Sequence, residues 1–173
     1  MKVALLIAPN NFKDESLSTL RVAFGKWGID AVVTSYSTKQ CTGYHGAVVM
    51  PQLNAARINP DEFDSIVLVD GPGVDLYKLY DFRPLLDTVS GFSSRKKLIA
   101  AIGNSIKILA RANIIADVKL AVPRDEETVR LVALYRGLPS VKSIESETNI
   151  ITIGNPDNVD QLAETLLARL GAK

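Results

Sequence analysis

The sequence is poor in the residues on which disulfides, zinc sites and thiol or imidazole catalysis depend. Its 173 residues include one cysteine, Cys41, and one histidine, His45. One cysteine cannot close an internal disulfide, and one cysteine with one histidine cannot supply the usual ligands of a zinc site. We therefore expect a reducing, cytoplasmic setting and no bound metal. A cysteine nucleophile would have to be Cys41, and a catalytic imidazole would have to be His45.

The sequence also lacks a charge excess and a long apolar run. It has 20 Lys and Arg against 19 Asp and Glu, a formal net charge of +1. That balance gives no electrostatic reason to expect nucleic acid or an anionic membrane as a partner. No segment approaches the roughly 20 apolar residues of a membrane-spanning helix. The apolar run at 3–8 ends at Pro9 and is shorter than a signal peptide requires.

What the sequence does contain is the composition and pattern of one globular α/β domain. Hydrophobic residues make up 47% and charged residues 23%, and the length suits a single domain. Unbroken apolar runs predict strands buried on both faces, and apolar residues spaced three or four apart predict amphipathic helices. We expect one doubly wound, mainly parallel sheet over 1–173, with helices on both faces. The predicted strands are 3–8, 29–35, 65–69, 97–102, 118–122 and 149–153, and the predicted helices 14–27, 81–92, 106–110, 126–136 and 159–170.

Two segments carry more detailed predictions. Asp14 is expected to cap the first helix, whose apolar residues Leu17, Leu20, Phe24 and Trp27 recur on one face. The irregular stretch 38–59 contains glycines and a proline, and we interpret it as a hairpin or an excursion at the sheet edge.

The ligand site of such a sheet lies beyond the carboxyl ends of the strands. The loop after the first strand has neither the glycine pattern of a dinucleotide fold nor a phosphate-binding loop, so we expect no nucleotide or flavin cofactor. The fourth strand runs directly into Gly103, Asn104 and Ser105 and then into a helix. A tight strand-to-helix turn of this kind is the layout of a nucleophile elbow.

Several segments in order along the chain together resemble the ThiJ/PfpI (DJ-one) superfamily, over Lys2 to about Leu170. The resemblance implies a flavodoxin-like fold and a dimer or larger homo-oligomer. It also implies peptidase, glyoxalase or deglycase, or chaperone-like activity. The segments that carry it are 3–8 with 12–17, 64–73, 101–103 with 109–112, and 149–152.

The resemblance also places the superfamily's active-site positions on this chain, and the reactive side chains are missing there. The position of the nucleophilic Cys is Gly103, and the following His position is Asn104. The Glu that contacts the Cys corresponds to Ser16. Glu15 is adjacent, but one step along a helix turns a side chain by about 100°. Glycine has no side chain to attack a carbonyl, so we expect the superfamily's thiol chemistry to be absent.

The turn after the third strand reads Asp70-Gly71-Pro72-Gly73, where the superfamily offers backbone N–H groups to an oxyanion. Gly71 keeps its N–H, whereas Pro72 has none. Asp70 replaces a usual glycine. Its carboxylate either binds a cationic or hydroxyl group of a ligand or bonds to N–H groups of its own turn.

Other candidate residues have two interpretations each. Ser105 is either a replacement nucleophile or a first-turn residue whose hydroxyl meets backbone N–H groups. Asn104 either caps the helix or contacts a ligand. Cys41 and His45 are either a reactive or metal-binding pair or parts of a surface loop.

Two functions remain open. The first is a non-catalytic binding, chaperone-like or scaffolding homo-oligomer with a degenerate site at Gly103, Asn104 and Ser16. The alternative is a divergent hydrolase or lyase, peptidase-like or glyoxalase-like, that uses Asp70, Glu15 or Ser105. The candidate pocket residues are Glu15, Asp70, Gly71, Gly73, Gly103, Asn104 and Ser105.

Overall fold

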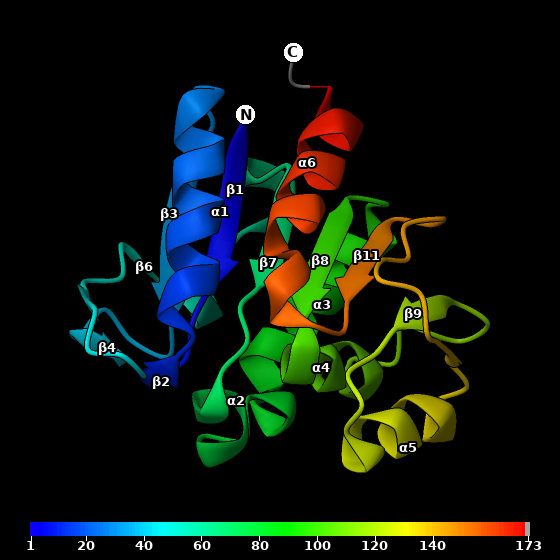
Figure 1. Ribbon diagram of the computed structural model, residues 1–173. Coiled ribbons are helices and arrows are strands. Elements are labelled where there is room, and N and C mark those ends of the chain that lie inside the picture. The colour runs from blue at the N-terminus through cyan, green and yellow to red at the C-terminus, as the bar shows by residue number, and fades with distance from the viewer. Residues whose placement is uncertain (172–173) are drawn as a thin grey trace.

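The computed structural model describes residues 1–171, with a six-stranded parallel sheet at its centre (Figure 1). The strand order is β11–β8–β7–β1–β3–β6, so the chain leaves β1 in one direction and returns to its other side as β7. The carboxyl ends of β1 and β7 therefore meet where the order reverses, the usual place for a ligand site. The strands are β1 (Lys2–Leu6), β3 (Asp30–Ser35), β6 (Leu53–Asn54), β7 (Ser65–Leu68), β8 (Leu98–Ile102) and β11 (Ile150–Ile153).

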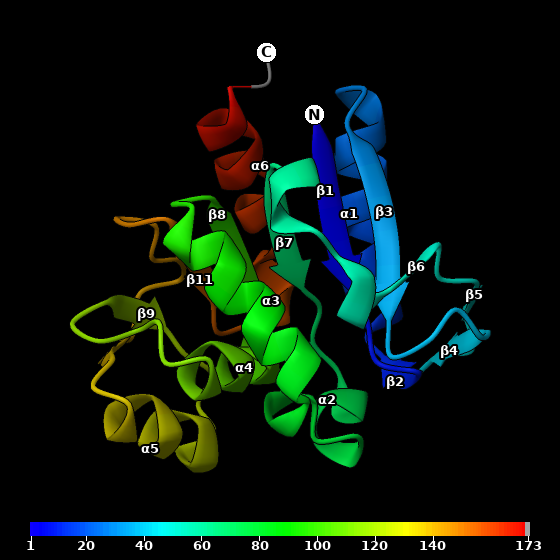
Figure 2. The ribbon, with the colours of Figure 1, turned by 180° about the vertical axis from the view of Figure 1, so that it is seen from behind.

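Helices cover both faces of this sheet, as the sequence predicts. Helices α1 (Asp14–Lys26) and α6 (Val159–Leu170) pack on one face, and α3 (Arg83–Ser94) and α4 (Ile106–Arg111) on the other (Figures 1 and 2). Successive residues of β1 alternate between the two cores, because side chains along a strand point to opposite faces. Both faces are covered, which explains why the strands are apolar without a break.

Two small sheets flank the main one. One contains β2 (Asn10–Phe12), β4 (Cys41–Gly43) and β5 (Val48–Val49), and β4 and β5 form the hairpin expected in 38–59. The other pairs β9 (Lys119–Ala121) with β10 (Leu138–Ser140). The strand predicted at 118–122 therefore lies outside the main sheet. Its Ala121 N–H donates to the side-chain hydroxyl of Thr152 at 2.8 Å, and Thr152 bridges to Glu145 along its backbone.

The first helix differs from its prediction at both ends. Its N-cap residue is Lys13, not Asp14, and no side chain caps the helix. The Asp14 carboxylate instead accepts from the backbone N–H groups of His45 and Ala47. Leu17, Leu20 and Phe24 are buried as expected, but Trp27 is 48% exposed, because the helix ends before it.

The remaining elements are short, apart from α5 (Glu126–Leu134), which ends slightly before its predicted boundary. Helix α2 (Pro72–Leu76), like β2, β6 and β10, is not predicted from the sequence, because so few residues show no periodicity. The 3₁₀ turns are η1 (Ala55–Arg57), η2 (Pro60–Glu62), η3 (Leu79–Asp81), η4 (Gly103–Ser105) and η5 (Pro156–Asn158).

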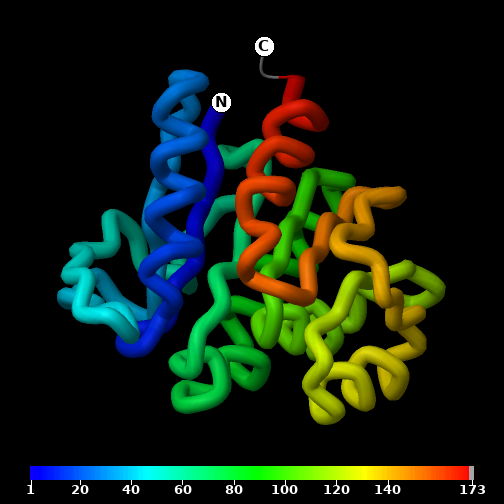
Figure 3. The backbone as a smooth tube through the Cα atoms, viewed as in Figure 1, coloured from blue at the N-terminus to red at the C-terminus, as the bar shows by residue number. Residues whose placement is uncertain are grey.

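Different elements gather at the two ends of the parallel strands. The N-terminus and the end of α6 lie together at the amino-terminal edge of the sheet (Figure 3). Helices α2, α4 and α5 and strands β2 and β4 gather at the opposite, carboxyl edge (Figure 1). Within residues 1–171, no helix has the length and apolar character needed to cross a membrane.

Candidate functional site

The turn from β8 into α4 has the shape of a nucleophile elbow without a nucleophile. Gly103 has φ +53°, a left-handed conformation that glycine adopts without strain. A Cβ on Gly103 would meet the Asp70 side chain and the Gly154 carbonyl at 3.6 Å, which is ordinary contact. The surroundings would therefore accept a small side chain, and only the backbone conformation favours glycine here.

The Ser105 hydroxyl is used within the backbone of the elbow. Ser105 is fully buried, its Oγ accepts from the N–H of Ile102 at 3.0 Å, and it lies 2.8 Å from the carbonyl oxygens of Ile102 and Leu68. This geometry matches the structural interpretation of Ser105, because a hydroxyl enclosed by three backbone groups does not face a substrate. It also ties the turn to the end of β7.

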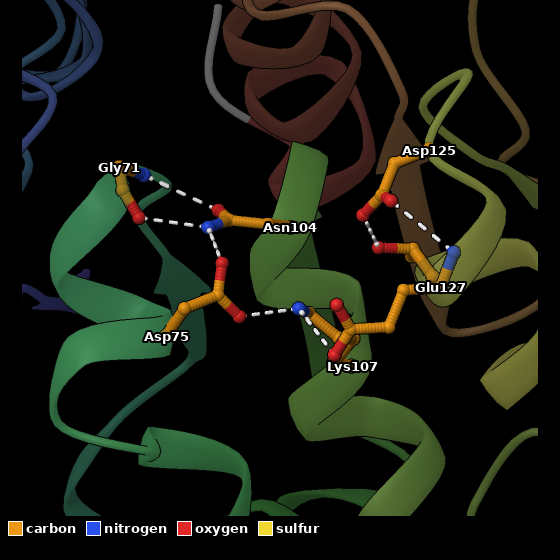
Figure 4. Close-up of polar contacts among 7 residues, drawn as sticks. Gly71, Asp75, Asn104, Lys107, Asp125 and Glu127 are labelled. Carbon is orange, nitrogen blue, oxygen red and sulfur yellow. Dashed lines mark hydrogen bonds and ion pairs between the residues drawn. The ribbon is translucent and has the colours of Figure 1, made fainter.

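The Asn104 side chain occupies the backbone groups of Gly71 (Figure 4). Its Oδ1 accepts from the Gly71 N–H at 3.2 Å, and its Nδ2 donates to the Gly71 carbonyl at 2.7 Å. One interpretation had Asn104 capping the helix, and the structure shows that its side chain does not. Pro72 has no N–H, and the N–H that Gly71 keeps in this turn is already hydrogen-bonded to Asn104.

Close packing explains the two glycines of the same turn. A Cβ on Gly71, at φ +133°, would overlap the backbone of Asn11, and one on Gly73 would overlap the backbone of Asn10. The turn thus presses against β2, and Lys13 N–H donates to the Asp70 carbonyl at 2.9 Å. Gly71 and Gly73 are required for packing.

Asp70 is a buried carboxyl beside the empty position at Gly103. It is 4% exposed, and its Oδ2 lies 3.8 Å from where a Cβ of Gly103 would be. Burial raises the pKa of Asp70 to about 6, although the neighbouring Ser16 hydroxyl and the Lys13 charge oppose the rise. The fully buried Ser16 Oγ lies near this carboxyl without a hydrogen bond of standard geometry, and Oδ1 of Asp70 likewise has no hydrogen-bond partner among the described residues. The site thus keeps one carboxyl, in the turn after β7 rather than on α1.

A charged network that the sequence did not reveal lies beneath Asn104. The Asn104 amide also donates to Asp75 at 3.2 Å, and Asp75 pairs with the ammonium of Lys107, whose side chain is 1% exposed (Figure 4). Lys107 also lies 3.5 Å from Glu127 and 5.2 Å from the centre of the Tyr80 ring. Burial lowers the pKa of Lys107, but the hydrogen bond and charge of Asp75 outweigh it and raise the pKa overall. A lone lysine inside the apolar run 106–110 is the sequence signal for such a network.

Glu15 and His45 meet at the protein surface. The His45 Nδ1 lies 2.6 Å from a Glu15 carboxylate oxygen, and both side chains are more than half exposed. Ligand atoms of Asp14, Glu15 and His45 lie within 4.8 Å of one another, so these residues could hold a metal ion. However, the Asp14 oxygens already accept two backbone N–H groups, which lower its pKa against the effect of burial.

Cys41 does not share the surroundings of His45. Its side chain is 1% exposed within the core beside α1, and its thiol contacts the Lys39 carbonyl. Burial raises the pKa of the Cys41 thiol, so its reactive thiolate is disfavoured. The structure therefore does not bring the two residues together as a reactive pair.

An open cleft of about 860 Å³ adjoins the elbow. Its lining includes Gly154, the residue after β11, whose carbonyl oxygen lies 3.6 Å from where a Cβ of Gly103 would be. The cleft lies at the carboxyl ends of β9 and β11, and it was not anticipated from the sequence. Its lining contains Arg124 and Lys142 as its charged residues.

Comparisons with known proteins agree with this architecture. An uncharacterised protein of Methanocaldococcus jannaschii is 30% identical over 156 residues, which cover 90% of this chain and 76% of that protein. The deglycase PfpI of Pyrococcus furiosus is 27% identical over 66% of this chain and 68% of its own length. The crystal structure of a ThiJ/PfpI domain protein from Brachyspira murdochii superposes with a TM-score of 0.92 at 21% identity, covering 99% of this chain and 97% of that one.

The family profile described as DJ-1/PfpI family matches residues 1–169, nearly the whole described chain. The chain belongs to the DJ-1/PfpI family.

Proposed function

We propose that this protein is a member of the DJ-1/PfpI family without thiol-dependent activity, and that it acts as a binding, chaperone-like or scaffolding homo-oligomer. The observation that carries the proposal is the double hydrogen bond between the Asn104 amide and Gly71. It occupies the backbone donor beside an elbow that has no nucleophilic side chain at Gly103.

The nucleophile position at Gly103 has no side chain, and the Ser105 hydroxyl and the Gly71 N–H are already hydrogen-bonded. A nucleophile requires a base within hydrogen-bond reach, and a developing oxyanion requires free donors. Ser105 is enclosed by backbone, and Glu15 points to His45 at the surface. These contacts support a binding role over turnover.

Activity assays test the proposal directly, because several relatives are named deglycases. We expect no consumption of methylglyoxal, no release of free amine or thiol from a glycated substrate, and no peptide hydrolysis above the rate of a heat-denatured sample. The matched variants are Asp70→Asn at the site and Asp87→Asn on the exposed surface of α3. Turnover that Asp70→Asn abolishes and Asp87→Asn preserves would overturn the proposal.

Asp70 supports a second candidate, a divergent hydrolase or lyase. A buried carboxyl with a pKa of about 6 is suited to general acid–base work near neutral pH. In this candidate Asp70 would take a proton from a bound water or substrate, without help from Glu15 or Ser105. Its signature would be a rate that rises through about pH 6 and is lost in Asp70→Asn.

A further inference from the structure

The cleft beside the elbow, which we call the Arg124–Lys142 cleft, is built from segments far apart in the sequence. Figures 1 and 2 show β9, α5 and the carboxyl end of β11 at one edge of the molecule. The hydrogen bond from Ala121 N–H to Thr152 holds β9 to β11 and so fixes the spacing of two walls. The cleft is lined by residues 122–124, Val129, 139–143, 154–156 and Asn158.

The size of this cleft suits a small organic molecule. Its volume of about 860 Å³ falls within the range of roughly 300–1,000 Å³ that is typical of ligand sites. The walls mix apolar and polar groups, as such sites do. The apolar lining residues are Val122, Pro123, Val129, Pro139, Val141 and Pro156, and the polar uncharged ones are Ser140, Ser143, Asn155 and Asn158.

The charges that line the cleft have one sign. Arg124 and Lys142 both contribute to it, with no Asp or Glu in the lining. Neither cation forms an ion pair with another residue of 1–171. The acidic neighbour of Arg124, Asp125, is engaged at the start of α5, where it accepts from the Glu127 N–H at 3.2 Å and the Thr128 hydroxyl at 2.6 Å.

The elbow cannot supply the counter-charge for an anion, but the cleft can. Asn104 occupies the Gly71 N–H, and the buried Asp70 carboxyl repels anions from that side once it is ionised. From these observations we infer that the Arg124–Lys142 cleft binds a small organic anion, a carboxylate or phosphate with an apolar body. The inference names the ligand class for the proposed binding role and rests on that role.

A pair of fluorescent probes separates charge from apolar contact. The anion 8-anilinonaphthalene-1-sulfonate and its uncharged counterpart N-phenyl-1-naphthylamine have similar apolar bodies. The variants are Arg124→Gln with Lys142→Gln, and the control Arg21→Gln, because Arg21 is an exposed cation on α1 outside the cleft. We expect the double variant to bind the sulfonate about tenfold more weakly. The control should bind it as the parent does, and the uncharged probe should be unaffected.

Two further measurements fix the location of the bound probe and the state of the protein. Amide chemical-shift changes on adding the sulfonate should centre on Ser140, Ser143 and Gly154, and circular dichroism should show every variant folded. Sulfonate binding that is unchanged in the double variant, or shifts centred away from the cleft, would overturn the inference. Enzymatic turnover with cleft binding intact would instead refute only the non-catalytic role, and absent binding without turnover would refute only the ligand class.

Discussion

Gly103 combines a left-handed backbone with room for a small side chain. Its φ of +53° would cost a non-glycine residue about 1 kcal/mol, while its nearest neighbours would stay 3.6 Å from an added Cβ. A cysteine placed at this position can therefore report how the elbow affects the pKa and reactivity of a thiol. The carboxyl of Asp70 is the charged group that such a thiol would face.

Gly103→Cys should give a folded protein with a thiol that alkylates slowly. Above about pH 6 the Asp70 carboxylate is ionised, and a negative neighbour raises a thiol pKa. Adding Asp70→Asn should speed alkylation by iodoacetamide about threefold to tenfold near neutral pH, since about one pKa unit changes the thiolate fraction tenfold. Mass spectrometry separates this site from Cys41, and Gly103→Cys with Asp87→Asn is the control. Equal rates in the three variants would show that Asp70 does not control the site.

The buried Asp70 should also make folding stability depend on pH. Its folded pKa of about 6 lies above the unfolded value, so the folded state binds the proton more tightly. Its contribution is therefore present below the unfolded pKa of about 3.9 and is lost as pH rises through about 6, by roughly 3 kcal/mol.

Urea unfolding near pH 5 and near pH 8 measures this slope. Relative to the parent, Asp70→Asn should lose less stability on going to the higher pH, and Asp87→Asn should keep the parental slope. The slope is the decisive quantity, because any cost of the uncharged amide is the same at both pH values. Parallel profiles for Asp70→Asn and the parent would contradict the raised pKa.

At the scale of elements, the carboxyl edge is held together by polar contacts between short helices. Lys107 joins α4 to Asp75 of α2 and Glu127 of α5, and Asn104 joins the elbow to α2 (Figure 4). Such short helices are only marginally stable in isolation. These contacts therefore hold α2, α4 and α5 in place beside the candidate site. Removing the partner of a buried charge lowers folding stability strongly, because the charge is then left uncompensated.

Asp75→Ala should therefore destabilise the protein more than Lys107→Met does. Removing Asp75 leaves the buried ammonium with Glu127 alone and should cost about 3 kcal/mol, whereas Lys107→Met replaces the charge with apolar volume and should cost about 1 kcal/mol or less. Once Lys107 is replaced by Met, adding Asp75→Ala should cause almost no further loss of stability. Urea unfolding of the three variants checks this, and additive losses would show that the two residues are not coupled.

Prediction from sequence succeeded for elements long enough to show a period. Helix α6 has its predicted bounds, and the six strands predicted as apolar runs all form. The interpretation failed at 118–122, because this strand pairs with β10 and meets β11 through the Thr152 hydroxyl, contacts that lie far along the chain. Asp14 was misassigned as a cap for the same reason, since its partners lie in the β4–β5 hairpin.

The whole molecule separates a compact, apolar sheet and helix framework from an edge that carries the polar groups. The two cores on either side of the sheet account for most of the buried apolar side chains. Some large apolar side chains remain on the surface, including Tyr44, Val48 and Met50, each at least 60% exposed in or beside the β4–β5 hairpin. Clusters of this kind commonly mark interaction surfaces.

At this scale we predict self-association. Sedimentation velocity should give a mass of at least twice the 18.8 kDa of one chain, because an oligomer interface can bury exposed apolar side chains. Val48→Asp with Met50→Asp in the hairpin should lower that mass, and the comparison variant Val22→Asp on α1 should leave it unchanged. A single species of 18.8 kDa at all concentrations would contradict the prediction.

By itself, the sequence determined the order of strands and helices and the absence of a thiol at Gly103. Periodicity and residue identity are local properties, so they can be read without knowing which segments meet. Only the tertiary structure decided that Asn104 closes onto Gly71, 33 residues away, and that Lys107 pairs with Asp75, 32 residues away. It also placed the Asp70 carboxyl against the elbow and opened the Arg124–Lys142 cleft. The physical reason is that hydrogen bonding, burial and pKa depend on neighbours in space, which chain folding alone brings together.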